Sequence, residues 1–176
     1  MSGLNRTVAL VGMMGAGKSS VGKRLAARLN LPFKDADTEI ETAAGCTINE
    51  IFERYGEPAF RDGERRVIAR LLSEPPQILA TGGGAFIDPE TRADIKKRAV
   101  SVWIKAPVGV LVDRVTRRDT RPLLKNGDPR EIVERLLKQR EPIYAEADLA
   151  IDSADGPHAK VVEEIVAALK ELGHIA

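Results

Sequence analysis

The chain reads Gly12-Met13-Met14-Gly15-Ala16-Gly17-Lys18-Ser19 between a short apolar run and an amphipathic stretch, and this order decides its fold. The eight residues fit the pattern G-x-x-x-x-G-K-[ST] of a loop that binds phosphate. The preceding Val8–Val11 run has the composition of a buried strand, and apolar residues between 21 and 29 recur at helical spacing. We therefore expect a strand, a phosphate loop and a helix, with nucleotide phosphate as the first ligand to consider.

Each part of this loop suits an anion. Glycines at 12, 15 and 17 allow backbone conformations that a Cβ atom would hinder, so that the loop and the helix N-terminus can turn N–H groups inward. Lys18 adds a positive charge for the β- and γ-phosphates, and the Ser19 hydroxyl can bind Mg²⁺. The alternative is a glycine-rich turn that binds nothing.

Length and composition limit the remaining possibilities. A chain of 176 residues suits one domain with a mobile insertion. Its formal net charge of +1 gives no indication of a nucleic-acid or membrane-surface partner. Cys46 stands alone, no stretch approaches the roughly 20 apolar residues of a membrane helix, and residues 1–6 lack an apolar signal core. We expect a cytoplasmic protein, in which His158 and His174 are solvated surface groups.

Apolar strand-like runs alternate with helical patterns along the chain. This alternation predicts an α/β fold, a parallel sheet of about five strands in a three-layer arrangement with helices on both faces. The expected strands are Val8–Val11, Ile78–Ala80, Val100–Ile104, Leu149–Ile151 and a weaker one near Leu31–Lys34. The expected helices cover about 17–29, 47–54, 57–73, 88–97, 107–117, 129–146 and 157–172, with a capping box at Thr47 and a first-turn proline after Asp88.

A phosphate loop alone fits ATPases, GTPases and small-molecule kinases. The chain lacks the Asn-Lys-x-Asp motif with which a GTPase reads guanine. An ATP-driven motor usually has a strand that ends in an acidic residue, whereas here the strand at 78–80 leads into Gly82-Gly83-Gly84. The acidic group must therefore come from elsewhere.

Asp35 and Asp37 are the acidic candidates, since they follow the weak second strand. Ligands of open α/β sheets bind at this carboxyl edge. Residues two apart in an extended segment point the same way, so both carboxylates are expected to face one pocket, one toward Mg²⁺ and its waters and one toward a substrate hydroxyl. The alternative is a helix-capping aspartate with a solvated neighbour.

Three further groups could contact a substrate. Arg61 and Glu64 lie three apart on a helix, which suits an arginine that binds a carboxylate and a glutamate that orients it, although a surface ion pair would have the same spacing. The triple glycine 82–84 indicates close approach of a ligand or, alternatively, a permissive turn. The arginine-rich segment 116–130, with Arg121-Pro122-Leu123-Leu124, suits a lid over phosphate, although a solvated face is the alternative.

Together these motifs resemble the shikimate kinases, which belong to the nucleoside-monophosphate-kinase group of P-loop proteins. The resemblance spans Leu10 to about Asp152. It rests on Gly12–Ser19, Asp35-Ala36-Asp37 with Ile40-Glu41, Ile48–Phe52 with Gly56-Glu57 and Phe60-Arg61-x-x-Glu64, Gly82–Gly84, Arg121–Leu124 and Arg140-x-Pro142-x-Tyr144. It implies a single kinase domain over 1–176, with a core at 7–115 and 131–172, a substrate-binding helical region at about 36–64 and a lid at about 116–130.

The resemblance implies transfer of the ATP γ-phosphoryl group to the 3-hydroxyl of shikimate, which yields shikimate 3-phosphate and ADP on the route to chorismate and aromatic amino acids. It implies Mg²⁺ as cofactor, bound by Ser19 and, through water, by Asp35. The implied catalytic residues are Lys18, Asp37 and Arg121. The implied ATP-binding residues are Gly15, Ala16, Gly17, Lys18, Ser19, Ser20, Arg114 and Arg121, with Arg117 as the alternative to Arg114. The implied shikimate-binding residues are Asp37, Arg61, Gly82, Gly83, Gly84 and Arg140, with Glu64 behind Arg61.

Two other functions stay open. Another small-molecule kinase of the group, such as gluconate kinase, would keep the loop and lid but has less need for paired arginines. A non-enzymatic nucleotide-binding switch would keep Gly12–Ser19 and need no substrate pocket. We expect ATP and shikimate as ligands, no nucleic-acid or membrane partner, and a monomer.

Overall fold

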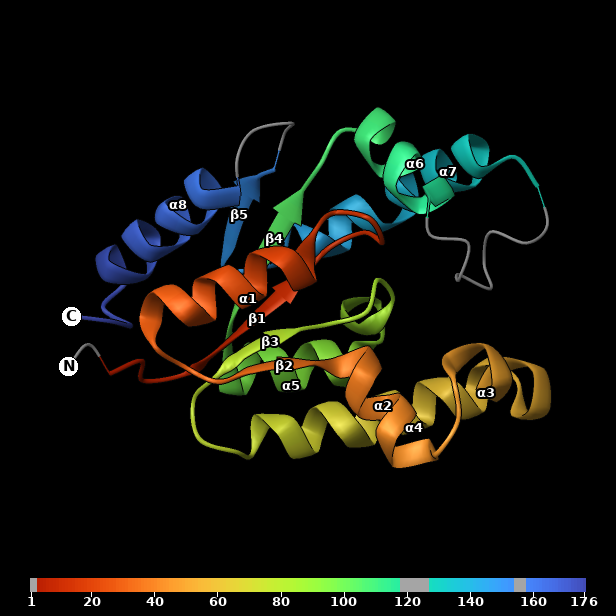
Figure 1. The fold of residues 1–176 in the computed structure, drawn as a ribbon, viewed down its shortest axis with the longest axis horizontal. Helices are drawn as coiled ribbons and strands as arrows, with labels where there is room; N and C mark the ends of the chain where they lie inside the picture. Colours follow the sequence, from red (N-terminus) through yellow and green to blue (C-terminus); the bar gives the residue numbers. More distant parts are fainter. Residues whose placement is uncertain (1–2, 118–126, 154–157) are drawn as a thin grey trace.

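A parallel five-stranded sheet with the order β2-β3-β1-β4-β5 forms the centre of the molecule (Figure 1). The computed structural model describes residues 3–117, 127–153 and 158–176. The strands are β1 (Thr7–Val11), β2 (Phe33–Asp35), β3 (Ile78–Ala80), β4 (Ala99–Lys105) and β5 (Leu149–Asp152). The predicted α/β class and the five predicted strands are confirmed, including the weak second one.

Helices cover both faces of this sheet. Helices α1 and α8 pack together on one face, and α4 and α5 lie on the other (Figure 1). The helices are α1 (Lys18–Leu29), α2 (Ala36–Ala44), α3 (Ile48–Tyr55), α4 (Glu57–Leu72), α5 (Pro89–Arg98), α6 (Val108–Arg117), α7 (Pro129–Tyr144) and α8 (His158–Glu171), with a 3-10 turn η1 (Ala85–Ile87).

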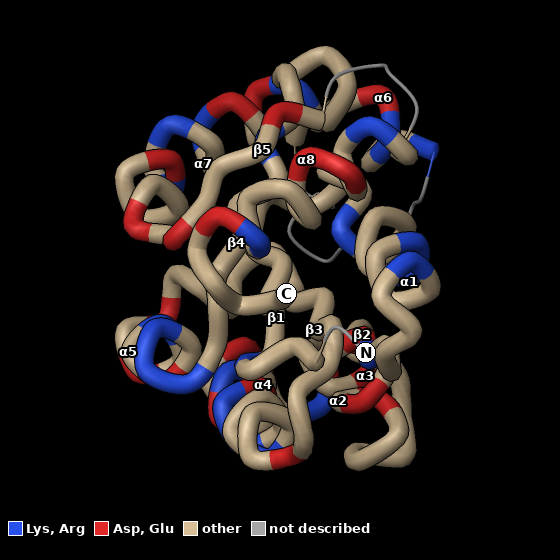
Figure 2. The backbone as a smooth tube through the Cα atoms, turned by 90° about the vertical axis from the view of Figure 1, so that its left-hand side faces the viewer, with Lys and Arg blue, Asp and Glu red and all other residues tan. Residues whose placement is uncertain are grey.

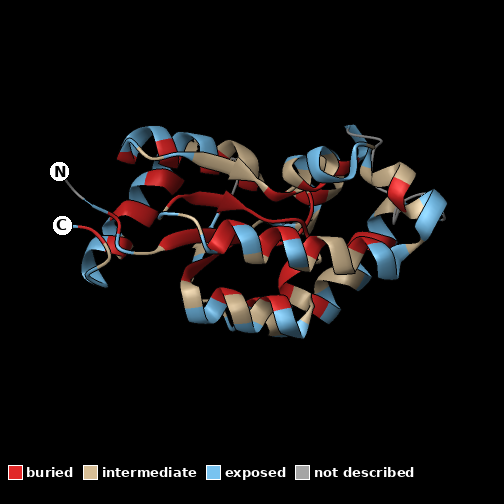
Figure 3. Ribbon diagram, turned by 90° about the horizontal axis from the view of Figure 1, so that it is seen from below, coloured by how far each residue is buried: buried red, intermediate tan, exposed pale blue. Residues whose placement is uncertain are grey.

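The core follows from this layered arrangement. All five residues of β1 are buried, as are the first six of β4, because helices cover both faces of the central strands (Figure 3). Gly22 brings α1 close to the sheet, since a Cβ atom there would lie 2.5 Å from the Phe33 ring. This close packing fixes the start of α1, and with it the phosphate loop, against the carboxyl end of β1.

Several helix starts match the sequence signals. Thr47 and Glu50 form the predicted capping box at α3, and Asp88 caps α5 with Pro89 in its first turn. Helix α2 is absent from the helices predicted from residue patterns, although it lies in the helical region at about 36–64 that the resemblance implies. Only Ala36 and Ile40 are buried on it, so it presents too little apolar periodicity to stand out.

Charge is spread over the helices rather than gathered on one face. Figure 2 shows basic and acidic residues mixed along the helices around nearly uncharged strands. No helix within the described part of the chain is both long and apolar enough to cross a bilayer.

Candidate active site

The phosphate loop joins β1 to α1 in the conformation that its glycines allow. Gly12, Gly15 and Gly17 have φ values of 142°, 82° and 91°, which L side chains rarely adopt. Gly17 is also the N-cap of α1 and offers no side chain to the first N–H groups of the helix. Because Gly17 has no side chain to cap them, the first N–H groups of the helix can bind an anion in front of the loop.

Lys18 places its positive charge inside this loop. The residue is 8% exposed, and its Nζ donates to Gly12 O at 2.6 Å and to Met13 O at 2.8 Å. A buried ammonium group needs such acceptors, because charge is costly to remove from water. The loop thus holds a cation beside its own inward-facing amides.

A cavity of about 400 Å³ opens in front of the loop. It contains acidic groups as well as cationic ones, which suits a phosphate ligand accompanied by a metal ion. The residues that line it are Gly15, Gly17, Lys18, Ser19, Ser20, Asp35, Asp37, Thr81, Arg114, Val115, Arg117 and His158.

Asp35 and Asp37 both reach this cavity, but the extended geometry expected for them is wrong. Helix α2 begins at Ala36, so Asp37 lies in its first turn. Asp35 is the N-cap, and its Oδ1 accepts from the N–H groups of Asp37 at 3.0 Å and Thr38 at 3.3 Å. Its Oδ2 accepts from Ser19 Oγ at 2.5 Å. Asp35 is therefore both a helix cap and a partner of the phosphate loop.

The triple glycine after β3 is where the predicted substrate residues converge. A Cβ atom on Gly82 would lie 2.9 Å from Asp37 Oδ1. On Gly83 it would lie 3.4 Å from Arg140 Nη1, and on Gly84 2.5 Å from both terminal nitrogens of Arg61. The missing side chains thus let one carboxylate and two guanidinium groups approach the same short loop.

The same loop also adjoins the phosphate loop. A Cβ atom on Gly83 would lie 3.2 Å from Met14 N. Thr81, just before the glycines, donates from Oγ1 to Leu10 O at 2.8 Å, which ties the end of β3 to β1. The two glycine-rich segments are therefore neighbours at one edge of the sheet.

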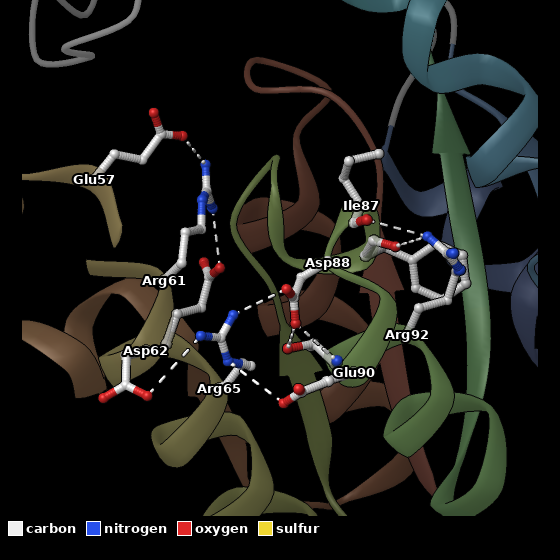
Figure 4. A network of polar contacts seen from close by, with 11 residues as sticks. Glu57, Arg61, Asp62, Arg65, Ile87, Asp88, Glu90 and Arg92 are labelled. Atoms are coloured by element: carbon white, nitrogen blue, oxygen red, sulfur yellow. Dashed lines mark hydrogen bonds and ion pairs between the residues drawn. The ribbon is translucent and has the colours of Figure 1, made fainter. Parts of the chain in front are cut away.

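Arg61 is held between two glutamates on α4. Nη1 donates to Glu64 Oε1 at 2.9 Å, and Nη2 lies 3.5 Å from Glu57 Oε1 (Figure 4). Glu64 is 1% exposed, and burial raises the pKa of its carboxyl against the opposing effect of Arg61. Arg61 and Glu64 therefore form more than a surface ion pair, because Glu64 is buried and Arg61 also lies beside Gly84.

Two more arginines fix the segment that follows the glycines. Arg65 Nη1 donates to Asp88 Oδ1 at 3.0 Å, and Arg92 Nη1 donates to the carbonyl oxygens of Phe86 and Ile87, each at 3.1 Å (Figure 4). These contacts connect η1 to α4 on one side and to α5 on the other. The glycine loop is therefore anchored at its far end.

Arg140 and Tyr144 approach the glycine loop from α7. Arg140 is 9% exposed, and its Nη1 has no hydrogen-bond partner within the described residues. Tyr144 is fully buried and donates from its hydroxyl to Gly83 O at 2.5 Å. Burial raises the pKa of the Tyr144 phenol, and the nearby Arg140 charge opposes this rise. The sequence motifs assign Tyr144 no role in the site.

The arginines on α6 differ in their surroundings. Arg114 Nη1 donates to Gly15 O at 3.0 Å, directly beside the phosphate loop. Arg117 lines the same cavity but pairs with Asp113 at 3.1 Å, with its side chain 76% exposed. Arg121 and most of the expected lid at 116–130 lie outside the described residues.

His158 lies beside the phosphate loop, contrary to its expected place on the solvated surface. It lines the cavity, and its Cε1 lies 3.5 Å from the position that a Cβ atom on Gly17 would occupy. No sequence signal marks it, because the first residue of a C-terminal helix approaches the loop only through the packing of α8 on α1.

Comparison with known proteins adds independent information. A family model described as shikimate kinase matches residues 14–170. A shikimate kinase from Bradyrhizobium diazoefficiens is 62% identical over 165 residues, which cover 94% of this chain and 80% of the relative. Another from Caulobacter vibrioides is 58% identical over 166 residues, which cover 94% of this chain and 83% of the relative.

Solved structures agree. The shikimate kinase from Acinetobacter baumannii, in complex with shikimate, superposes with a TM-score of 0.92 at 38% identity over 94% of this chain and 93% of that chain. A gluconokinase from Sinorhizobium meliloti reaches 0.61 at 21% identity, over 96% of this chain and 94% of its own. The second likeness concerns the fold alone.

Proposed function

The chain belongs to the shikimate kinase family, and from this premise we propose how its residues divide the transfer of a phosphoryl group from ATP to shikimate. The observation that carries the proposal is the convergence of Asp37, Arg61 and Arg140 on the three glycines beside the phosphate loop. One side of the site thus suits phosphate and the other a hydroxylated carboxylate.

ATP binds in the cavity before the phosphate loop. The amides of Gly15, Ala16 and Gly17, with Lys18, surround the β- and γ-phosphates, and Ser19 and Ser20 continue the site into α1. Arg114 contacts the adenine side of the nucleotide. Its hydrogen bond to Gly15 O favours it over Arg117 for this role.

The cavity also fits Mg²⁺. No cluster of three or more His, Cys, Asp or Glu residues able to hold a metal occurs in the described part of the chain. Ser19 and Asp35 supply two oxygens that lie 2.5 Å apart, and Mg²⁺ commonly relies on few protein ligands plus phosphate and water. Ser19 would hold the ion directly and Asp35 through water. When bound, it neutralises charge on the β- and γ-phosphates.

Shikimate binds at the glycine loop. Arg61 and Arg140 hold its carboxylate, because a guanidinium group matches a carboxylate with two parallel hydrogen bonds. Glu64 orients Arg61 from behind. Asp37 accepts hydrogen bonds from ring hydroxyls. Gly82, Gly83 and Gly84 present their backbone to the ring and have no side chain that would displace Asp37, Arg140 or Arg61.

Catalysis then rests on position and charge. Asp37 orients the 3-hydroxyl toward the γ-phosphate and accepts its proton late in the transfer. Lys18, Arg121 and the loop amides stabilise the charge that develops on the phosphoryl group. The lid at 116–130 closes over the bound substrates and excludes water that would otherwise hydrolyse ATP.

A coupled assay of ADP release tests these roles. The native chain should release ADP with shikimate and not with gluconate, whereas a nucleotide-binding switch would show no acceptor-dependent turnover. Asp37→Asn should lower kcat at least a hundredfold and leave ADP affinity within about twofold. Asp62, a half-exposed aspartate on α4, provides the matched control, and Asp62→Asn should retain full turnover. An unchanged kcat in Asp37→Asn would contradict the role of Asp37.

The organisation of the chain is part of the same proposal. We place the core at 7–115 and 131–172, the substrate-binding region at about 36–64 and the lid at about 116–130. A monomeric state and a cytoplasmic location are predictions from the sequence, and sedimentation of the purified chain would test the first of them.

A further inference from the structure

Arg92 lies on α5 and faces the 3-10 turn that follows the glycine loop 82–84 (Figure 4). Its Nη1 donates to the carbonyl oxygens of Phe86 and Ile87, each at 3.1 Å. The last carbonyl groups of a helical turn lack partners within it, and Phe86 is fully buried, so these oxygens need a donor from outside η1. Arg92 therefore holds the segment by which the chain leaves the glycine loop.

The guanidinium group of Arg92 also approaches the segment just after α7. Its Nε lies 3.8 Å from Oε1 of Glu146, which comes two residues after the end of α7 at Tyr144. Lys96, one turn further along α5, pairs with the same carboxylate oxygen. The hydrogen bond from Lys96 and the charges of Lys96 and Arg92 lower the pKa of Glu146. Glu146 therefore stays ionised at neutral pH and keeps the end of α7 beside α5.

These contacts bear on the proposed shikimate pocket, because α7 carries one of its two arginines. Arg140 lies one turn before Tyr144 on α7, and the Tyr144 hydroxyl donates to Gly83 O. Tyr144 thus ties α7 to the glycine loop, while Arg92 ties the segment after that loop to the end of α7. A carboxylate bound by both Arg61 and Arg140 requires a fixed distance between α7 and the glycine loop.

We propose that Arg92 is a positioning residue for shikimate, which holds the segment after the glycine loop against the end of α7 and thereby keeps Arg140 within reach of the substrate carboxylate. This role rests on the proposed function, and within it Arg92 contacts neither shikimate nor ATP. Loss of Arg92 should therefore act on shikimate binding and not on the phosphate loop.

Arg92→Met removes the polar contacts and keeps the apolar stem of the side chain. It should raise KM for shikimate about tenfold and change kcat by less than about threefold, because a small displacement of a binding group is costly. The Kd of ADP should stay within about twofold of the native value, since the change lies on the substrate side. Steady-state kinetics and calorimetric titration with ADP measure these effects. An unchanged KM, or equal weakening of both ligands, would overturn the role of Arg92.

Arg98 on the same helix provides the matched control. It donates to the carbonyl oxygen of Ala69 at 3.0 Å and pairs with Asp94 at 2.7 Å, so it makes the same kinds of contact away from the glycine loop. Arg98→Met should lower the melting temperature much as Arg92→Met does and leave KM for shikimate as it is. An equal rise of KM in both variants would identify lost stability as the cause and would overturn the role of Arg92.

Glu146→Gln tests the link to α7 with a variant that should fold as the native chain does. The Glu146 side chain is 42% exposed, and exposed ion pairs contribute little to stability. The substitution should raise KM for shikimate about threefold in the native chain and cause no further rise in Arg92→Met, because contacts that act together are not additive. An unchanged KM in Glu146→Gln, or additive effects in the double variant, would overturn the link.

Shikimate-dependent ADP release by the native chain tests the proposed function separately. Absence of turnover in the native chain would contradict the proposed function and the role of Arg92 with it. Native turnover together with an unchanged KM in Arg92→Met would contradict the role of Arg92 alone.

Discussion

Glu64 is deeply buried and also contacts Arg61, the arginine proposed to bind the substrate carboxylate. These two features have opposite effects on the pKa of Glu64. Burial raises the pKa of its carboxyl above the ordinary value of 4.5, while the charge of Arg61 and the hydrogen bond from it act in the other direction. The negative charges of Asp37 and Asp88 add to the rise. The ionised carboxylate that orients Arg61 therefore weakens the folded state.

This conflict predicts a pH-dependent gain in stability for Glu64→Gln. The pKa of Glu64 is higher in the folded state than its ordinary value of 4.5, so protonation of this carboxyl stabilises the folded state. This stabilisation is complete below about pH 4.5 and is lost as the pH rises through the pKa of the folded state. The variant, which is neutral throughout, should melt above the native chain at pH 8, and by a smaller margin at pH 5. Thermal unfolding by circular dichroism at both pH values measures this difference.

Glu57→Gln is the control for that prediction. Glu57 contacts the same arginine, but its side chain is 52% exposed and the ion pair is 3.5 Å long. Exposed pairs of this kind contribute little to stability. A gain in melting temperature as large as that of Glu64→Gln would show that burial is not the cause.

Gly84 and Gly63 differ in what a methyl group would meet. At Gly84 the new Cβ would lie 2.5 Å from both terminal nitrogens of Arg61, which must move away. Gly84→Ala should therefore lower kcat/KM for shikimate roughly tenfold or more, since small displacements of binding groups are costly, and leave ADP affinity unchanged. Steady-state kinetics and ADP titration measure the two effects.

Gly63→Ala provides the comparison on α4. Nothing lies within 4 Å of a Cβ atom there, so the substitution should leave kcat/KM as it is. It should also stabilise the chain by about 0.5–1 kcal/mol, because alanine favours a helix interior over glycine. Equal losses of activity in both variants would contradict the role given to Gly84.

The residue types of the site can be predicted from the sequence more readily than their geometry. Spacing and motif alone mark Asp35, Asp37, Arg61 and the glycines. The extended backbone predicted between the two aspartates is wrong, because Asp35 caps α2 and the chain does not stay extended. The alternative of a capping aspartate therefore holds for Asp35, which also accepts a hydrogen bond from Ser19.

Helix α7 is joined to the glycine loop 82–84 by one hydrogen bond, which the phenol of Tyr144 donates. The Tyr144 hydroxyl satisfies Gly83 O, and the same helix carries Arg140. Tyr144→Phe would leave this carbonyl without its donor, which costs about 1–3 kcal/mol when buried. We expect lower stability in urea and a several-fold weaker affinity for shikimate, with ADP affinity unchanged.

The chain contains one other tyrosine, which serves as control. Tyr55, at the end of α3, is 66% exposed, so Tyr55→Phe should change neither stability nor affinity. If Tyr144→Phe weakened ADP and shikimate binding equally, the phenol would be a general packing group rather than a support of the substrate side.

The order of the strands explains why the site as a whole lies beyond prediction from the sequence. Alternation predicts parallel strands, yet it does not say that β3 enters the sheet between β2 and β1. That placement brings Gly82–Gly84 between Asp37 and the phosphate loop. The approach of α8 to α1, which brings His158 to the cavity, is likewise a result of tertiary packing.

The proposed division into a nucleotide-binding core and a substrate-binding region makes a prediction for the molecule as a whole. A ligand at about a hundred times its Kd stabilises the folded state by about 2.7 kcal/mol, which raises Tm by roughly 5–10 °C for a chain of this size. Arg61→Ala should therefore keep the rise caused by ADP and lose the rise caused by shikimate. Lys18→Ala should lose the rise caused by ADP and keep the rise caused by shikimate, because the charge of Lys18 lies in the phosphate loop and not beside Gly82–Gly84. Thermal shifts of the native chain and both variants, measured with each ligand alone, test this division, which would fail if each variant lost its response to both ligands.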